Sequence, residues 1–292
     1  MTDRSARRRR WIVAAVSGAF VAWFGGGLLG AYLLTAPVTS AVVPTAILAG
    51  CTVEDVATIT DDGLTVRGWL VRARPDSRDC VVLAAGIRGN RQSMRGRAEW
   101  YLAHGWSALL VDLRGTGVSD AVPISFGRHE SGDLHAWRTF LRQRSFDRIG
   151  AHGQSLGAAA IVYGDGAFDF CVLESCYTDI DEALRARLSF VPWPGLLLWP
   201  LRLGCSWRLG LDAASLRPIE RIASLRAPTL ILDGELDTKV GDDAGRRLFD
   251  ACAAASKHLV TIRGAAHVDL FGADLVTCSA ALAAFVPPAS VR

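Results

Sequence analysis

Hydrophobic and polar residues follow three different patterns along the chain. Residues 11–36 contain no charged side chain. Between residues 54 and 286, short apolar runs alternate with amphipathic stretches, in which apolar residues recur every three or four positions. Residues 177–218 interrupt this alternation with a segment rich in Trp, Leu and Pro. These patterns predict an N-terminal apolar helix and one main domain that contains an insertion.

The short apolar runs of the main domain are typical of buried strands. An Asp-Gly turn ending at residue 63 lies between two β-rich runs and predicts an antiparallel hairpin over residues 56–71. Further strands are predicted at 80–85, 107–111, 170–174, 229–233 and 258–262, and one more leads into residue 153. Helices are predicted at 91–104 and 131–144. Since strands alternate with helices, we expect an α/β fold with a mostly parallel sheet covered by helices on both faces.

The apolar run 11–36 follows five arginines within residues 1–10 and is long enough to cross a bilayer as a helix. Arginines stay on the cytoplasmic side, so we expect a single-pass anchor with the main domain outside the cytoplasm. A signal peptide cleaved near residues 39–41 and a twin-arginine export signal are the alternatives. Residues 37–53 are expected to form a linker, and residues 287–292 a tail.

The insertion at 177–218 is predicted to be a cap of short helices over the main domain. Its aromatic residues include Trp193 and Trp199, which we expect to line an apolar substrate pocket or to rest on a membrane surface. A second membrane span is disfavoured by three prolines and Arg202. The simplest alternative is that these side chains only pack the cap onto the sheet.

Composition excludes some classes of function. The formal net charge is +3, and most of the positive charge lies in the first ten residues, so no nucleic-acid partner is expected. Seven cysteines show neither CxxC pairs nor Cys/His ligand spacing, so no metal site is expected. Whether any cysteines pair or all are small buried residues stays open.

The sequence Gly153-x-Ser155-x-Gly157 is the first candidate for chemistry. An apolar run precedes it and an Ala-rich helix former follows it. This order predicts a nucleophile elbow, a sharp turn between strand and helix that exposes the serine hydroxyl. A serine hydroxyl needs a base to take its proton and a carboxylate to orient that base.

Two histidines follow Ser155 in the sequence. His258 begins a predicted strand, whereas His267 follows the end of that strand, where the chemistry of a parallel sheet is found. Asp237 lies just after the preceding strand and is the candidate acid, with Asp233 and Glu235 as rivals nearer the strand end.

The chain resembles the α/β-hydrolase superfamily over residues 54–286. Within it, the chain is similar to bacterial hydrolases of the serine-aminopeptidase and monoglyceride-lipase type. The stretches that carry the resemblance are 86–91, 112–120, 153–157, 173–175, 216–219, 233–237 and 264–267. The resemblance implies Ser155 as nucleophile, Asp237 as acid and His267 as base. It also implies an oxyanion hole formed by the backbone N–H groups of Ile87 and Leu156.

One position departs from the family pattern, since Ala85 stands where a histidine usually precedes the glycine of the oxyanion loop. The resemblance implies a serine hydrolase that cleaves a carboxylic ester of a small molecule or lipid without any cofactor. A peptidase or thioesterase with the same residues is the enzymatic alternative. A membrane-tethered scaffold that has lost turnover is the non-enzymatic one.

Overall fold

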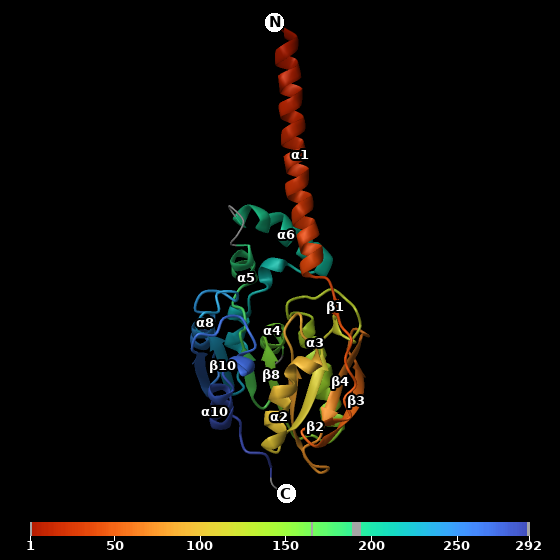
Figure 1. Ribbon diagram of the computed structural model, residues 1–292, viewed down its shortest axis with the longest axis vertical. Coiled ribbons are helices and arrows are strands. Elements are labelled where there is room, and N and C mark those ends of the chain that lie inside the picture. The colour runs from red at the N-terminus through yellow and green to blue at the C-terminus, as the bar shows by residue number, and fades with distance from the viewer. Residues whose placement is uncertain (1, 165, 189–193, 291–292) are drawn as a thin grey trace.

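The computed structural model describes residues 2–164, 166–188 and 194–290. One long helix, α1, stands out from a body in which helices surround a sheet (Figure 1). The strands are β1 (Val38–Thr39), β2 (Ile47–Leu48), β3 (Cys51–Ile59), β4 (Thr65–Val71), β5 (Asp79–Ala84), β6 (Ser107–Asp112), β7 (Thr116–Gly117), β8 (Arg148–Gln154), β9 (Cys171–Glu174), β10 (Thr229–Gly234) and β11 (Lys257–Ile262).

Ten α-helices and three short 3₁₀ turns connect the strands in the described part of the chain. The helices are α1 (Thr2–Leu34), α2 (Arg95–Ala103), α3 (Glu130–Gln143), α4 (Leu156–Tyr163), α5 (Ile180–Arg187), α6 (Pro194–Leu209), α7 (Pro218–Arg221), α8 (Ala244–Ala251), α9 (Leu270–Ala273) and α10 (Leu275–Phe285). The 3₁₀ turns are η1 (Arg91–Met94), η2 (Ala213–Ser215) and η3 (Ile222–Ser224).

The main sheet has the order β11-β10-β9-β8-β5-β6-β4-β3-β2 in the described residues. The strands from β11 to β6 are parallel, whereas β4, β3 and β2 continue the sheet in antiparallel pairing. The predicted α/β class, the hairpin and each predicted strand are confirmed.

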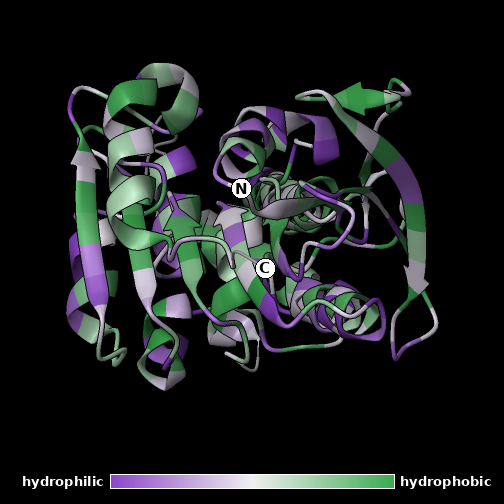
Figure 2. Ribbon diagram, turned by 90° about the horizontal axis from the view of Figure 1, so that it is seen from below, coloured by the Kyte–Doolittle hydropathy of each residue, from purple (hydrophilic) through white to green (hydrophobic). Residues whose placement is uncertain are grey.

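Side chains of the central strands alternate between two hydrophobic cores, one on each face of the sheet. In β5, Val82 and Ala84 belong to the core that α3, α4 and α8 cover. Val81 and Leu83 belong to the core that α2, α9 and α10 cover. Helices flank the sheet on both sides when the molecule is seen along its long axis (Figure 2). Burial on both faces explains why these strands read as continuous apolar runs.

The stretch predicted as a linker, residues 37–53, is instead part of the body. Its β1 pairs in parallel with β7, and its β2 pairs with the start of β3. The last turn of α1 joins the same region, because Thr35 is fully buried and its carbonyl accepts the N–H of Ile124 at 2.9 Å. Two-residue strands carry no periodic signal, so the sequence pattern could not reveal them.

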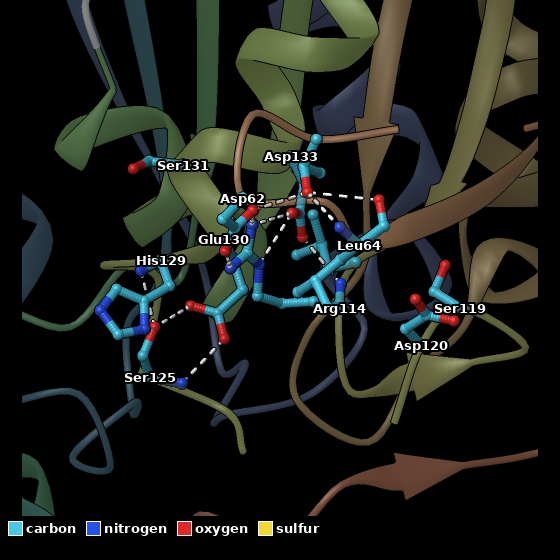
Figure 3. Close-up of polar contacts among 12 residues, drawn as sticks. Asp62, Leu64, Arg114, Ser119, Asp120, Ser125, His129, Glu130, Ser131 and Asp133 are labelled. Carbon is cyan, nitrogen blue, oxygen red and sulfur yellow. Dashed lines mark hydrogen bonds and ion pairs between the residues drawn. The ribbon is translucent and has the colours of Figure 1, made fainter. Parts of the chain in front are cut away.

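A buried ion-pair cluster holds the loop that follows β6. Arg114 lies between Asp62 of the β3–β4 turn and Asp133 of α3, and forms ion pairs with both (Figure 3). In the same region, the Glu130 carboxylate accepts the hydroxyl of Ser125. Because Arg114 and Asp133 are buried, the cluster fixes this loop against the hairpin and α3.

Candidate active site

Ser155 occupies a strained turn between β8 and α4. Its backbone has φ 49° and ψ −102°, which few residues other than glycine adopt. The N–H of Ser155 donates to the carbonyl of Glu174 on β9 at 2.8 Å, which holds the turn at the carboxyl end of the sheet. Such strain persists only where the surroundings impose it, and it concentrates at active sites.

The two glycines of the turn are required by close packing. A Cβ at Gly157 would collide with the carbonyl of Ala84 on β5, and a Cβ at Gly153 would collide with the backbone of Gly157. These approaches involve backbone atoms, which cannot move aside. The helix can therefore start directly above β5 and β8 only with glycine at both positions.

His267 and Asp237 come together at the same edge of the sheet. Nδ1 of His267 lies 2.8 Å from Oδ2 of Asp237, and Oδ1 of Asp237 accepts the N–H of Lys239 at 3.0 Å. The Asp237 side chain is fully buried, whereas that of His267 is 26% exposed. A carboxylate held in this way fixes the imidazole ring and leaves its Nε2 free to face a substrate.

The rival residues have other partners. Oδ2 of Asp233 accepts the N–H of Gly245 at 2.8 Å, and Oε2 of Glu235 accepts the N–H of Gly264 at 2.7 Å. His258 is exposed at the start of β11, at the opposite end of the sheet from His267. Of the three acidic side chains considered, Asp237 is the one that contacts His267.

Asp233 is nevertheless electrostatically unusual. Its side chain is largely buried, and its Oδ1 has no hydrogen-bond partner in the described structure. Burial, and to a smaller extent the nearby Asp237, raise the pKa of Asp233, whereas the N–H groups of Gly245 and Gly234 and the His267 ring lower it, and the net pKa is about 6.

Ser155 and His267 lie at one edge of the sheet but are not hydrogen-bonded to each other. Within the part of the chain that the structure describes, no hydrogen bond joins the hydroxyl of Ser155 to the His267 ring. Catalytic hydrogen bonds are often long without substrate and tighten in the reactive complex.

The predicted oxyanion loop follows β5 directly. A Cβ at Gly86 would lie 3.5 Å from the Cβ of Ser155, so this loop passes beside the nucleophile candidate. Over the described ranges, the N–H groups of Ile87 and Leu156 find no acceptor in the protein. Two free backbone donors next to Ser155 can hold a developing negative charge.

A buried polar network that the sequence analysis missed lies behind this edge. Arg97 of α2 forms a two-point ion pair with Glu174, and Nε2 of His152 is 2.5 Å from Oε1 of the same carboxylate. Arg97 also contacts Asp269, two residues after His267, at 2.7 Å. Burial raises the pKa of Glu174, but Arg97 and His152 outweigh it and hold that pKa at about 2.

The network connects residues from four separate elements, so no local pattern indicates it. The available signal was the type of residue, since His152 and Glu174 lie within strands that are otherwise apolar. A buried charge in such a strand must have a partner.

In the described residues, the segment predicted as a cap, residues 177–218, contains α5, α6 and η2, and its α5 contacts the loop that carries Asp237. Arg187 of α5 donates to the carbonyl of Lys239, two residues after Asp237. Trp193 lies outside the described residues. Trp199 of α6 stacks on Trp23 of α1 with ring centroids 6.0 Å apart and is 58% exposed, so the described contacts place it against α1.

Nothing in the described structure provides a metal centre. No group of three His, Cys, Asp or Glu side chains in residues 2–164, 166–188 and 194–290 could hold an ion. All seven cysteines are free, six of them buried and Cys51 partly exposed. Burial raises the pKa of the Cys205 thiol to about 11, which makes it unreactive at neutral pH.

The elbow, the sheet order and the comparison with known proteins together define the class. No family model matches the sequence. A Pyrococcus furiosus esterase, Pf2001, has the same fold, with a TM-score of 0.71 and 20% identity over 86% of this chain and 97% of that one. The hydrolase GrgF from Penicillium gives a TM-score of 0.62 and 20% identity over 80% and 97% of the two chains. These neighbours show that the chain has the α/β-hydrolase fold.

The chain shares a family with an uncharacterized protein of Mycobacterium tuberculosis, Rv2307c. The two sequences are 34% identical over 242 residues, which is 80% of this chain and 76% of the relative. A polyketide transferase of Stachybotrys chlorohalonatus, ATR5, is 29% identical over 56% of this chain and 52% of its own length.

Proposed function

We propose that the protein is a serine hydrolase that cleaves a carboxylic ester through an acyl-enzyme intermediate. The observation that carries this proposal is the His267–Asp237 pair, 2.8 Å apart at the sheet edge where Ser155 is held in its strained turn. The hydrolase fold of the neighbouring structures supports the reaction class.

The proposed mechanism uses these groups in order. Oγ of Ser155 attacks the acyl carbonyl carbon while Nε2 of His267 takes the hydroxyl proton, and Asp237 stabilises the imidazolium that results. The N–H groups of Ile87 and Leu156 hold the negative oxygen. His267 then gives its proton to the leaving alcohol as the ester C–O bond breaks. Water repeats the sequence on the acyl-enzyme and releases the acid.

The same groups also suit a peptidase or a thioesterase. A neighbouring structure with a TM-score of 0.57 is an acylaminoacyl peptidase of Pyrococcus horikoshii, which matches 74% of this chain and 38% of that chain. We place the ester first because several neighbouring structures are esterases and because α6 exposes large apolar side chains. The scaffold alternative without turnover rests on Ala85 in the oxyanion loop, but the donors there are backbone groups that any side chain leaves intact.

A fluorophosphonate probe tests the nucleophile, because it labels only an activated serine. Ser155→Ala should abolish labelling, and Ser155→Ala or His267→Ala should lower ester turnover by at least about 10³-fold. Ser256→Ala and His258→Ala are matched controls, since both residues are exposed at the opposite end of the sheet. Labelling that persists in Ser155→Ala, with the fold intact by circular dichroism, would refute the assignment.

The acid is tested by comparing three variants. Asp237→Asn should lower kcat far more than Glu235→Gln or Asp233→Asn, because only Asp237 contacts His267. Equal losses in all three variants would contradict its role.

The substrate class is tested with p-nitrophenyl esters of graded chain length beside aminoacyl anilides and acyl thioesters. We expect esters to be cleaved best, with kcat/KM rising by up to about fourfold for each added methylene until the pocket is full. A preference for anilides would indicate a peptidase, and a preference for thioesters would indicate a thioesterase.

We further propose that α1 is a retained membrane anchor rather than a cleaved signal. Residues 6–34 form a helix long and apolar enough to cross a bilayer. Its last turn is built into the body, where Ala31 and Thr35 are buried, and β1 pairs with β7 just beyond it. Cleavage near residues 39–41 would remove all of these contacts. Intact-mass measurement of the mature protein tests this, and a species lacking residues 1–40 would overturn it.

A further inference from the structure

The cap helix α6 packs directly on the apolar helix α1. Nε1 of Trp23 donates to the carbonyl of Leu196 at 2.7 Å. A Cβ at Gly27 would lie 2.6 Å from the Pro200 ring, and a Cβ at Gly204 would lie 2.7 Å from Ala31. Small residues therefore let the two helices approach closely, as they do in membrane-embedded helix pairs.

The positions of these contacts along α1 fix the depth of α6 in a bilayer. The last arginine before the apolar run is Arg10, and the first contact with α6 is at Trp23. The twelve positions from Trp11 to Trp23 rise about 18 Å, far less than the roughly 30 Å of a hydrocarbon core. Tilting α1 would shorten the distance further. A bilayer that α1 crosses must therefore extend past Trp23 and include the level of α6.

The far boundary of the hydrocarbon core coincides with the other end of the helix contact. Counting from Trp11, roughly 20 residues at 1.5 Å each reach Gly30. Arg208 of α6 lies over the ring of Tyr32, with its guanidinium carbon 4.2 Å from the ring centroid. An aromatic ring and an arginine are typical of the interface between lipid and water. The contacts from Trp23 to Tyr32 thus place α6 inside one leaflet.

The outer face of α6 fits this environment. Four large apolar or aromatic side chains recur on it at helical spacing: Leu196, Trp199, Leu203 and Trp207, which are 61%, 58%, 44% and 86% exposed. Leu198, Leu201, Cys205 and Leu209 are buried on its other side, where Leu201 lies against Gly30 of α1. The charge of Arg202 is compensated by Asp181 of α5 at 3.2 Å, as expected for a charge near lipid.

We propose that α6 inserts its outer face into the bilayer that α1 crosses, in the leaflet nearest the body. The protein then contacts lipid through two helices, and the cap itself is part of the membrane-bound surface. Both α1 and α6 lie above the carboxyl edge of the sheet (Figure 1). That edge carries Ser155, so, if the proposed function holds, the nucleophile lies on the side of the body that faces the bilayer.

The test measures lipid contact and does not depend on activity. The full chain carries Ser155→Ala to make it inactive and Cys51→Ser to remove the partly exposed thiol, since the other six thiols are buried. Trp207→Cys or Leu203→Cys is then labelled with the fluorophore NBD in phosphatidylcholine vesicles. Ile47→Cys is the control, because Ile47 is 63% exposed on β2, far from α1 (Figure 1).

NBD at positions 207 and 203 should emit at shorter wavelength than at position 47. It should be quenched by doxyl-labelled lipid and several-fold less by aqueous iodide, with the reverse at position 47. Iodide quenching at 207 and 203 equal to that at 47 would overturn the proposal. Protection from iodide without quenching by doxyl lipid would also overturn it, because a second copy of the chain or another protein would then cover α6.

Discussion

Asp233, near the end of β10, and Asp237, in the loop that follows, are four residues apart but have different surroundings. Both oxygens of Asp237 have partners, one of them His267. Asp233 is largely buried, one of its oxygens has no described partner, and burial raises its pKa to about 6. A carboxyl group of this kind stabilises the folded protein only while it is protonated.

The raised pKa of Asp233 has a consequence for stability that can be measured. Between about pH 4 and pH 6, the folded protein retains a proton on Asp233 that the unfolded chain has released, so stability falls as pH rises through this window. Two pKa units correspond to about 3 kcal/mol. We compare the free energy of unfolding of Asp233→Asn with that of the wild type at each pH. The difference in favour of the variant should be up to about 3 kcal/mol larger at pH 7 than at pH 4.

Urea unfolding at the two pH values, in detergent, gives this difference. The control is Asp242→Asn, because Asp242 is an exposed carboxyl on the loop that follows and its substitution reports the effect of removing a surface carboxylate. An Asp233→Asn effect that does not change with pH would mean that Asp233 is ionised in the folded protein.

At the residue scale, the sequence predicts the candidate site residues that can be recognised by their order along the chain. Ser155, Asp237 and His267 follow strands whose carboxyl ends share one edge, and this was sufficient to select them as candidates. It did not reveal the contact of Arg97 with Glu174 and Asp269, because these residues lie far apart in sequence and meet only through the sheet topology. It also did not distinguish the surroundings of Asp233 from those of Asp237, which depend on burial.

At the scale of elements, periodicity predicts the long strands and helices. It predicts neither the two-residue strands nor contacts between elements that are far apart in sequence. Strands such as β5 were predicted because both of their faces are buried. The pairing of α1 with α6 was not predicted, because about 170 residues separate Trp23 from Leu196. Prolines argue against a second membrane span, and the described part of the chain gives α6 16 residues, with Pro200 inside it, against the roughly 20 that a span needs.

Adjacent glycines in α1 allow a matched test of this helix pairing. Gly27 faces Pro200, whereas a Cβ at Gly26 would meet nothing within 4 Å. Gly27→Val should cost about 1–3 kcal/mol by overpacking against the Pro200 ring and the nearby Leu201 backbone. Gly26→Val shares the change in helix propensity without the clash, so it separates the two effects.

Thermal unfolding in detergent measures the comparison. We expect a melting temperature several degrees lower for Gly27→Val than for Gly26→Val. If the two variants melt at the same temperature, α1 does not pack on α6 as described.

At the scale of the whole molecule, the N-terminal arginines and the exposed apolar face of α6 lie at different positions along the long axis. The arginines that precede Trp11 occupy the free end of α1. Helix α6, with its apolar outer face, lies beside the other end of α1, next to the body. A bilayer that begins after the arginines and ends at the level of α6 has the basic end of α1 on one side and the body on the other. Five arginines before an uncharged span favour the cytoplasm for that end, so we predict that the body lies outside the cytoplasm.

This orientation can be tested on intact cells from which the wall has been removed. Protease added outside should degrade the body and leave a protected N-terminal fragment, because residues 1–10 and most of α1 are shielded by the cytoplasm and the bilayer. An epitope tag at the N-terminus should remain intact until detergent is added, and a tag at the C-terminus should be lost at once.

The control is a cytoplasmic protein that must survive the treatment. A C-terminal tag that survives until the membrane is permeabilised would show that the body faces the cytoplasm. Insertion of α6 does not depend on that outcome, since the same leaflet contacts form whichever side the body occupies.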